Sequence, residues 1–315
     1  MLPPQPLARS LLAPMTNAHT VARALRTRTL PMIVAPVAAG AALAYARGFD
    51  FAWGWFAVTI VGAVALQLGS NALGDVADAR SGADKLARVD RGAIATDPGL
   101  IESGQMSARE MLSLTAALYG VAVVCGVVLA IARGWLVLPL GAAGALLAWQ
   151  YWWPPVKYGY RGFGQAGTFA TFGVLAVVGA YYVQAKRFDT VAIWASIVPG
   201  LFMSVVLFTH DLLHYRSDKA AGKLTPVARW GDEFGLIVVG GWLTLVYVVL
   251  TVEVAFKVFP VWTLAAVATA IPVAGSWARA FRDSIVQNCL NLLGATLGAA
   301  VLTTMTIGLS LLFWR

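Results

Sequence analysis

The chain has 315 residues, of which 59% are hydrophobic and 12% are charged, and its formal net charge is +8. A water-soluble domain carries about 25% charged residues, and half that share cannot cover a surface that faces water. The composition therefore excludes a soluble globular enzyme, a disordered chain, a coiled coil and a secreted disulfide scaffold. Its two cysteines, Cys125 and Cys289, lie in or beside apolar runs and match no metal or disulfide pattern.

The first segment, residues 1–29, is basic and contains Arg9, Arg23, Arg26 and Arg28. No cleavage-type sequence follows a short apolar core, so the segment is not typical of a secretory signal peptide. We interpret it as a basic leader with a short amphipathic stretch that lies on the membrane surface. The remainder, residues 30–315, is predicted to form one membrane domain.

Apolar runs follow, each close to the length of about 20 residues that a helix needs to cross a bilayer. They are rich in Ala, Val, Leu and Gly, and small residues let helices pack closely in lipid. Such continuous runs lack the alternation of an outer-membrane barrel. The sequence therefore predicts an all-α integral membrane protein with nine transmembrane helices, at 30–46, 52–74, 108–131, 135–153, 166–184, 190–210, 234–256, 259–277 and 289–314.

Basic residues divide unequally between the two sides of such a bundle. If the N-terminus is cytoplasmic, the inner segments hold 17 of the 23 Lys and Arg residues and the outer segments hold six. The positive-inside rule then predicts a cytoplasmic N-terminus and an outside C-terminus. Basic inner loops that face anionic lipid head groups explain the net charge of +8 without a nucleic-acid partner.

Acidic residues gather in two places, and both are on the predicted inner side. Seven of the 15 lie between positions 75 and 110, and four lie between positions 211 and 233. Each cluster contains three polar residues at helical spacing, i, i+4, i+7 in the first and i, i+3, i+7 in the second, so each set shares one helix face. The two sets are Asn71, Asp75 and Asp78, and Asp211, His214 and Asp218.

Carboxylates at a membrane boundary are usually functional or paired. Mg²⁺ takes one or two protein carboxylates and completes its shell with water and phosphate oxygens, and nearby cations bind a diphosphate directly. Acidic residues that can bind a metal, next to basic residues that can bind an anion, therefore predict a metal–diphosphate site. The alternative is an ordinary solvated inner loop with snorkelling cations. The basic residues near the two sets are Arg80, Lys85, Arg88, Arg91, Arg216, Lys219 and Lys223.

Five segments in order carry a resemblance to a known family, and they lie at 28–36, 71–84, 160–164, 179–184 and 218–231. With them, the chain resembles the UbiA superfamily of intramembrane prenyltransferases over nearly its whole length. Within that superfamily it is most similar to the 1,4-dihydroxy-2-naphthoate prenyltransferases of menaquinone synthesis. The resemblance implies nine helices around a central cavity, in which two aspartate motifs hold Mg²⁺ over an isoprenyl diphosphate.

The family roles are carried over to matching positions of this chain. The implied metal ligands are Asp75, Asp78, Asp84, Asp211 and Asp218. The implied diphosphate-binding residues are Asn71, Arg80, Arg161, Lys219 and Lys223. The residues expected to take part in catalysis are Asp75, Asp78, His214 and Asp218.

The resemblance also implies the reaction. Mg²⁺ neutralises charge on the diphosphate as the allylic bond breaks, and an electron-rich carbon of an aromatic acceptor attacks the cation in a dry cavity. Aromatic faces could stabilise that cation. For Trp152 and Trp153 we favour a place in the membrane-interface belt instead. The chain departs from the family pattern at Gly74, Gln165, His210 and His214. The second motif is therefore poorer in negative charge.

Alternatives remain within and outside the superfamily. The acceptor could be a homogentisate, a 4-hydroxybenzoate or the phenol of a specialised metabolite. CDP-alcohol phosphotransferases need a Gly and two further Asp at fixed offsets after Asp78, which are absent. A transporter would place ionisable residues deep within spans, whereas Glu253 lies near the end of its run. We expect a bacterial cell-membrane protein whose site opens to the cytoplasm; the sequence leaves the oligomeric state open.

Overall fold

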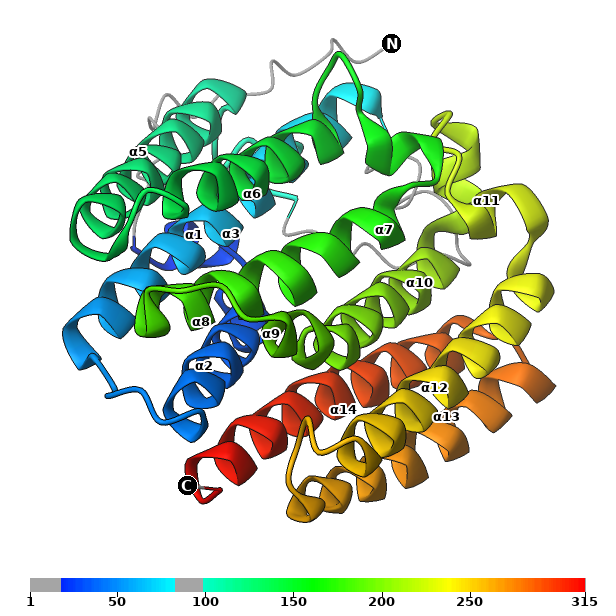
Figure 1. Cartoon of the computed structure of the whole chain (residues 1–315). Coiled ribbons are helices and arrows are strands. Elements are labelled where there is room, and N and C mark those ends of the chain that lie inside the picture. The colour runs from blue at the N-terminus through cyan, green and yellow to red at the C-terminus, as the bar shows by residue number, and fades with distance from the viewer. Residues whose placement is uncertain (1–17, 83–98, 315) are drawn as a thin grey trace, which may run out of the picture.

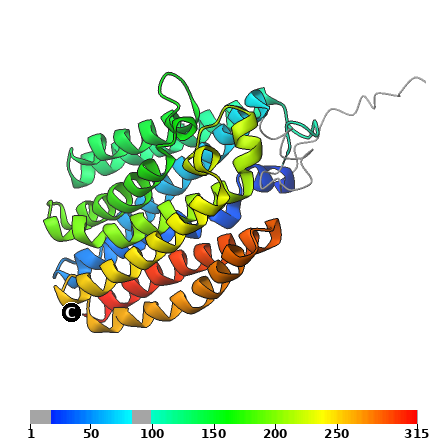
Figure 2. The ribbon, with the colours of Figure 1, turned by 90° about the vertical axis from the view of Figure 1, so that its right-hand side faces the viewer.

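The computed structural model describes residues 18–82 and 99–314, and they form a bundle of helices that run side by side (Figures 1 and 2). The described residues contain no strand. The all-α prediction is therefore confirmed. Most of the predicted leader, residues 1–17, and the segment 83–98 with Asp84 lie outside the described residues.

The first half of the chain supplies four long helices and the short elements around them. In order these are α1 (Ala18–Ala24), the 3₁₀ turn η1 (Thr27–Thr29), α2 (Pro31–Ala46), α3 (Trp53–Ser81), α5 (Ala108–Arg133), α6 (Val137–Trp152) and the 3₁₀ turn η2 (Tyr158–Arg161). Ser107 caps α5 in a reciprocal capping box with Glu110, which satisfies backbone donors at the start of that helix.

The next span is continuous but not uniform, because α7 (Gly164–Thr168), the π-helical segment η3 (Phe169–Leu175) and α8 (Ala176–Ala185) follow one another without a break. The remaining elements are α9 (Thr190–Ala195), α10 (Ile197–Ala220), α11 (Pro226–Trp230), α12 (Asp232–Ala255), the 3₁₀ segment η4 (Val261–Thr269), α13 (Ala270–Arg282) and α14 (Val286–Leu312). Thr225 caps α11, and Pro226 follows at its first position.

All nine predicted apolar runs are helical in the structure. Eight of the described helical segments are long and apolar enough to cross a membrane. The ninth predicted run forms α6, which has 16 residues and is shorter than the usual span of about 20 residues. The chain is therefore an integral membrane protein, while the count of nine spans is not confirmed.

Small residues set the closest helix contacts, as expected for packing in lipid. A Cβ on Gly40 of α2 would lie 2.2 Å from the Val177 carbonyl oxygen of α8. A Cβ on Gly173 of η3 would lie 2.6 Å from the Gly200 Cα of α10. Backbones meet at these two positions, so the second contact holds the π-helical segment directly against α10.

The end of the bundle at which α3 and α10 finish, at Ser81 and Ala220, is called the motif end below. Figure 2 shows α1 and α11 at this end and the C-terminus at the opposite end. Both sequence clusters therefore come together at one end of the bundle, and the described chain begins and finishes at opposite ends.

Candidate active site

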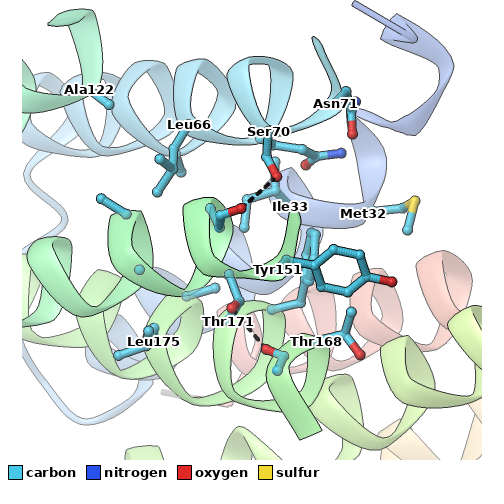
Figure 3. Close-up of a pocket in the computed structure, with 18 of the residues that line it drawn as sticks. Met32, Ile33, Leu66, Ser70, Asn71, Ala122, Tyr151, Thr168, Thr171 and Leu175 are labelled. Atoms are coloured by element: carbon cyan, nitrogen blue, oxygen red, sulfur yellow. Dashed lines mark hydrogen bonds between the residues drawn. The ribbon is translucent and has the colours of Figure 1, made fainter. Parts of the chain in front are cut away.

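A cavity of about 650 Å³ lies among α2, α3, α5, α6, the α7–α8 span and α10. Its lining is mostly apolar, and in Figure 3 Leu66, Ala122 and Leu175 gather toward one side while Asn71 and Tyr151 lie toward the other. The predicted central cavity is therefore present, with a polar part at the motif end and a longer apolar part.

Two helices carry most of the polar part of the cavity lining, each as a stripe at helical spacing. On α3 the lining residues pass from Gly62 and Leu66 to Asn71 and Asp78. On α10 they pass from apolar to polar in the same direction: Met203, Val206, Leu207, His210, His214, Ser217 and Asp218. Residues three and four apart share a helix face, so both stripes turn polar as they approach the motif end.

Asp78 and Asp218 are the two acidic residues among the described residues that line the cavity. The Tyr160 hydroxyl donates to Asp78 Oδ1 at 2.7 Å, which orients that carboxylate. Lys223 Nζ lies 3.4 Å from Asp218 Oδ1, and both side chains are buried. The other oxygen of Asp218, Oδ2, is buried and has no hydrogen-bond partner among the described residues.

Lys223 is the buried cation of the site. Burial alone would lower the pKa of its ammonium group, but the nearby carboxylates of Asp218, Asp78 and Asp211 outweigh burial and raise that pKa. Lys223 therefore keeps its charge at neutral pH. The backbone fixes its place, because the Lys223 N–H donates to the Asp218 carbonyl at 2.7 Å just after α10.

Asp75 does not line the cavity, because its carboxylate is paired with the Arg26 guanidinium. Arg26 itself does line the cavity and has a left-handed backbone conformation, with φ 49°. Two residues of α3 fix that turn: the Asn71 amide donates to Leu25 O at 3.2 Å, and the Gln67 amide donates to Thr29 O at 2.9 Å. Arg26 is a site residue that the sequence did not predict. The sequence signal for Arg26 is its position just before the family-like segment at 28–36.

Asp211 is also turned away from the cavity, where it accepts a hydrogen bond from the Gln165 amide at 2.8 Å. His210 and His214, which flank Asp211 on α10, both line the cavity, and their ring centres are 4.6 Å apart. The second motif thus presents two imidazoles and one carboxylate to the cavity, with Asp211 held behind them.

Three other predicted site residues lie outside the cavity lining. Arg80 is exposed and stacks over the Trp153 ring at 4.8 Å. Arg161 is exposed and donates to Pro155 O at 3.3 Å, and Lys219 is exposed. Asp84 lies in the segment outside the described residues. Asn71, Asp78, His214, Asp218 and Lys223 are the predicted site residues that the fold brings to the cavity.

Aromatic side chains close the cavity near its polar part. Tyr151, Trp152 and Tyr158 line it, and the Tyr151 ring packs edge-on against Trp152 at 4.5 Å and against Tyr158 at 5.3 Å. Gly159 makes room for this cluster, because a Cβ there would lie 2.6 Å from the Tyr151 ring. Trp152 therefore faces the cavity, while Trp153, its neighbour in sequence, packs with Arg80.

The residues present fit a divalent cation that is shared with a ligand. No three His, Cys, Asp or Glu side chains within the described ranges form a protein-only metal site. Mg²⁺ does not need one, because it usually binds one or two carboxylates and fills its shell with water and substrate phosphate. The unsatisfied Oδ2 of Asp218, across the same cavity from Asp78, provides such a ligand.

Comparison with known proteins shows which family the chain is similar to. Residues 33–290 match the UbiA prenyltransferase family. A 1,4-dihydroxy-2-naphthoate octaprenyltransferase of Mycobacterium leprae is 35% identical over 235 residues, which covers 72% of this chain and 76% of the relative. A 2-carboxy-1,4-naphthoquinone phytyltransferase of Synechocystis is 27% identical, over 84% of this chain and 82% of the relative.

Solved structures share the fold at low sequence identity. A UbiA homolog from Aeropyrum pernix superposes with a TM-score of 0.65 at 16% identity, over 87% of this chain and 98% of that chain. A UbiA homolog from Archaeoglobus fulgidus, solved bound to GPP and Mg²⁺, superposes with a TM-score of 0.64 at 13% identity, over 93% of this chain and 99% of that chain. The family match covers most of the chain, and so the chain belongs to the UbiA prenyltransferase family, as its sequence motifs predict.

Proposed function

We infer that this prenyltransferase moves a prenyl group from an isoprenyl diphosphate to 1,4-dihydroxy-2-naphthoate within the membrane, as a step of menaquinone synthesis. The observation that carries the proposal is the juxtaposition of Asp78, Asp218 and Lys223 at the polar end of a long apolar cavity. An isoprenyl diphosphate matches this cavity, because it is polar at one end and apolar along its tail. The naphthoate is supported by the relatives named for it, at 33–35% identity.

Asp78 and Asp218 would hold Mg²⁺, and Asp75, Asp84 and Asp211 stay predicted members of the two motifs. Bound there, Mg²⁺ supplies Lewis-acid neutralisation of the diphosphate charge that grows as the allylic C–O bond breaks. Tyr160 keeps the Asp78 carboxylate in place through its 2.7 Å hydrogen bond. A residue that hydrogen-bonds to a metal-binding side chain orients that side chain and supports metal affinity.

Two cations of the chain complete the anion site. Lys223 and Arg26 line the cavity, and each is anchored by a carboxylate, Asp218 and Asp75 respectively. Cations held in place before the reaction stabilise a developing negative charge without reorganisation. Asn71 supports Arg26 through the turn that it binds. Arg80, Arg161 and Lys219 lie outside this lining, and contacts from them to the diphosphate stay a prediction.

The prenyl tail would lie along the apolar part of the cavity, between α3, α5, α6 and the α7–α8 span. The faces of Tyr151, Trp152 and Tyr158 can stabilise an allylic cation formed next to the diphosphate. The apolar walls also exclude water that would quench it. His210 and His214 line the same cavity and would supply hydrogen-bond partners for the hydroxyl groups of the acceptor.

The motif end is proposed to face the cytoplasm of a bacterial cell, with the C-terminus on the outer side. The distribution of 17 basic residues on one side against six on the other supports this orientation. Residues 1–29 would then lie along the inner membrane surface, and the described part of them, α1 and η1, does lie at the motif end.

The test is a product analysis with the purified protein in lipid nanodiscs and Mg²⁺. Isoprenyl diphosphates of several lengths are offered with a panel that includes 1,4-dihydroxy-2-naphthoate, homogentisate and 4-hydroxybenzoate, and products are identified by mass. We expect a prenylated naphthalene product that has lost CO₂, and none from the Asp218→Asn variant. Preferred prenylation of another acceptor would contradict the naphthoate assignment.

A further inference from the structure

A second hollow, of about 440 Å³, lies at the motif end between the segment that follows α6 and the segment that joins α10 to α11. Tyr160 connects it to the cavity, because its ring lines the hollow while its hydroxyl donates to Asp78. The two walls are tied together: the Leu224 N–H donates to Tyr160 O at 2.9 Å, and Arg229 donates to Arg161 O at 3.1 Å. The hollow is therefore a fixed feature of the fold.

Its charge is entirely positive. Lys157, Arg161 and Arg229 line it, and no acidic residue does. Within residues 18–82 and 99–314, none of the three forms an ion pair. They contact neutral groups: Lys157 Nζ lies 3.6 Å from the centre of the Tyr160 ring, and Arg229 Nε donates to Leu224 O at 3.1 Å. A guanidinium has five N–H donors, so these contacts orient both arginines and leave donors for an anion.

Lys157 has an unfavourable backbone conformation and an unfavourable environment for its charge. Its backbone is left-handed, with φ 48°, a conformation that a residue with a side chain rarely adopts. Burial lowers the pKa of its ammonium group; the Asp78 carboxylate acts in the opposite direction, and the positive charge of Lys223 adds to the lowering. A bound anion would stabilise the charged form of a partly buried cation that lies near another cation.

Exposed apolar residues adjoin these cations: Leu224 lines the hollow itself, and Val156, Phe163 and Trp230 lie within two positions of Lys157, Arg161 and Arg229 in the sequence. Val156, Phe163, Leu224 and Trp230 are each between 43% and 64% exposed. Aromatic side chains beside cations are typical of the depth at which lipid head groups meet the hydrocarbon core. A ligand that fits here carries a phosphate group and apolar chains in one molecule.

We propose that this hollow binds the phosphate group of an anionic membrane phospholipid, held by Lys157, Arg161 and Arg229, with its acyl chains over Phe163 and Trp230. A free diphosphate has the same head-group chemistry but nothing to cover the exposed apolar residues, so the lipid is the occupant that accounts for both features. The test measures lipid binding rather than turnover, so its outcome is independent of the predicted contact between Arg161 and the prenyl diphosphate.

The experiment measures lipid binding by native mass spectrometry of the full-length protein in detergent, titrated with phosphatidylglycerol or phosphatidylcholine. The site variant is Arg161→Gln/Arg229→Gln. The charge-matched control is Arg109→Gln/Arg282→Gln, two exposed arginines at the motif ends of α5 and α13. Each cation near an anionic lipid contributes about fivefold in affinity. We expect roughly 25-fold weaker phosphatidylglycerol binding in the site variant, little change in the control, and unchanged phosphatidylcholine binding in both.

The Arg229 side chain bonds backbone carbonyls, so its loss can disturb the loop that it supports. Lys157→Gln is therefore a second variant, because the Lys157 ammonium group contacts a ring and not the backbone. About fivefold weaker phosphatidylglycerol binding is expected from it. Thermal melting verifies that each variant is folded. Equal losses in the site and control variants, or unchanged affinity in all of them, would overturn the proposal. Displacement of bound phosphatidylglycerol by inorganic diphosphate at the same low concentrations would also overturn it, because the hollow would then be a diphosphate site.

Discussion

Lys223 and Asp218 form an ion pair inside the bundle, with Nζ 3.4 Å from Oδ1 and both side chains buried. The pair joins the last turn of α10 to the loop before α11, and it leaves the second oxygen of Asp218 unsatisfied among the described residues. A buried pair with one open acceptor is costly as a purely structural device. It is suited to a site in which a ligand or ion completes the arrangement.

The first prediction concerns Lys223. The Lys223→Gln variant leaves the Asp218 carboxylate buried without its cation, which destabilises a protein by about 3–5 kcal/mol. It also removes a fixed donor to the leaving group, a loss of about 10²–10³ in rate. Lys186→Gln, at an exposed lysine just after α8 and outside the predicted site, is the matched control and should change little. Thermal unfolding and turnover under saturating Mg²⁺ measure both effects, and equal behaviour of the two variants would be inconsistent with the site.

The pH dependence of this stabilisation follows from the raised pKa of Lys223. A cation whose pKa is raised on folding stabilises the protein fully below its ordinary value near 10.5, and the stabilisation is lost only as the pH rises through the higher folded value. The difference in melting temperature between the wild type and Lys223→Gln should therefore stay constant from about pH 7 to about pH 9.5. A difference that disappears within that range would show that Lys223 titrates there.

Tyr160 is predicted to position Asp78. Tyr160→Phe removes the hydrogen bond to Asp78 Oδ1 and keeps the ring over which Lys157 lies. Loss of such an outer partner usually costs about 10–100-fold in metal affinity or activity. The apparent Mg²⁺ requirement for turnover should rise accordingly. The control is Tyr247→Phe, which removes a hydroxyl bonded to Thr269 away from the cavity; a similar rise there would argue against a positioning role.

Arg26 and Asp75 are predicted to act as a unit. Arg26→Gln and Asp75→Asn should each weaken binding of the isoprenyl diphosphate, and the double variant should be little worse than either single one, because residues in direct contact are not additive. The measurement is a double-mutant cycle on the KM for the diphosphate. If the effects of the two substitutions on KM add, and only Asp75→Asn alters the Mg²⁺ dependence, then Asp75 is an independent metal ligand.

His214 tests how far the second motif has changed. It lines the cavity one helical turn before Asp218. An imidazole suits Zn, Fe or Cu better than Mg²⁺, whereas a carboxylate adds an oxygen ligand. We therefore expect His214→Asp to preserve or raise Mg²⁺-dependent turnover. A large loss of turnover in a folded His214→Asp variant would show that the histidine has a chemical role of its own.

The sequence predicts the helices well because apolar runs in a membrane protein must be helical to satisfy their backbone. It predicts their inner ends poorly. The runs at 52–74 and 190–210 end where polar residues begin, yet α3 continues to Ser81 and α10 to Ala220. The motif residues therefore lie on helix beyond the apolar run, where hydropathy carries no signal.

Helical spacing also identifies part of the site. It places Asn71 and Asp78 on one stripe and His214 and Asp218 on the other, and the fold brings all four to the cavity. Spacing cannot show which acids are diverted by distant partners. Asp75 binds a residue 49 positions away and Asp211 one 46 positions away. The bond from Tyr160 to Asp78 spans 82 positions, so only the folded chain shows it.

The central claim is that Asp78 and Asp218 together hold a divalent ion and, through it, a prenyl diphosphate. The most direct measurement is the affinity of the purified protein for a non-reactive isoprenyl thiodiphosphate, with and without Mg²⁺, by isothermal titration calorimetry. The wild type and Asp211→Asn should bind far more tightly with Mg²⁺, whereas folded Asp78→Asn and Asp218→Asn should lose that Mg²⁺-dependent gain. Undiminished Mg²⁺-dependent binding in Asp78→Asn and Asp218→Asn would contradict the account.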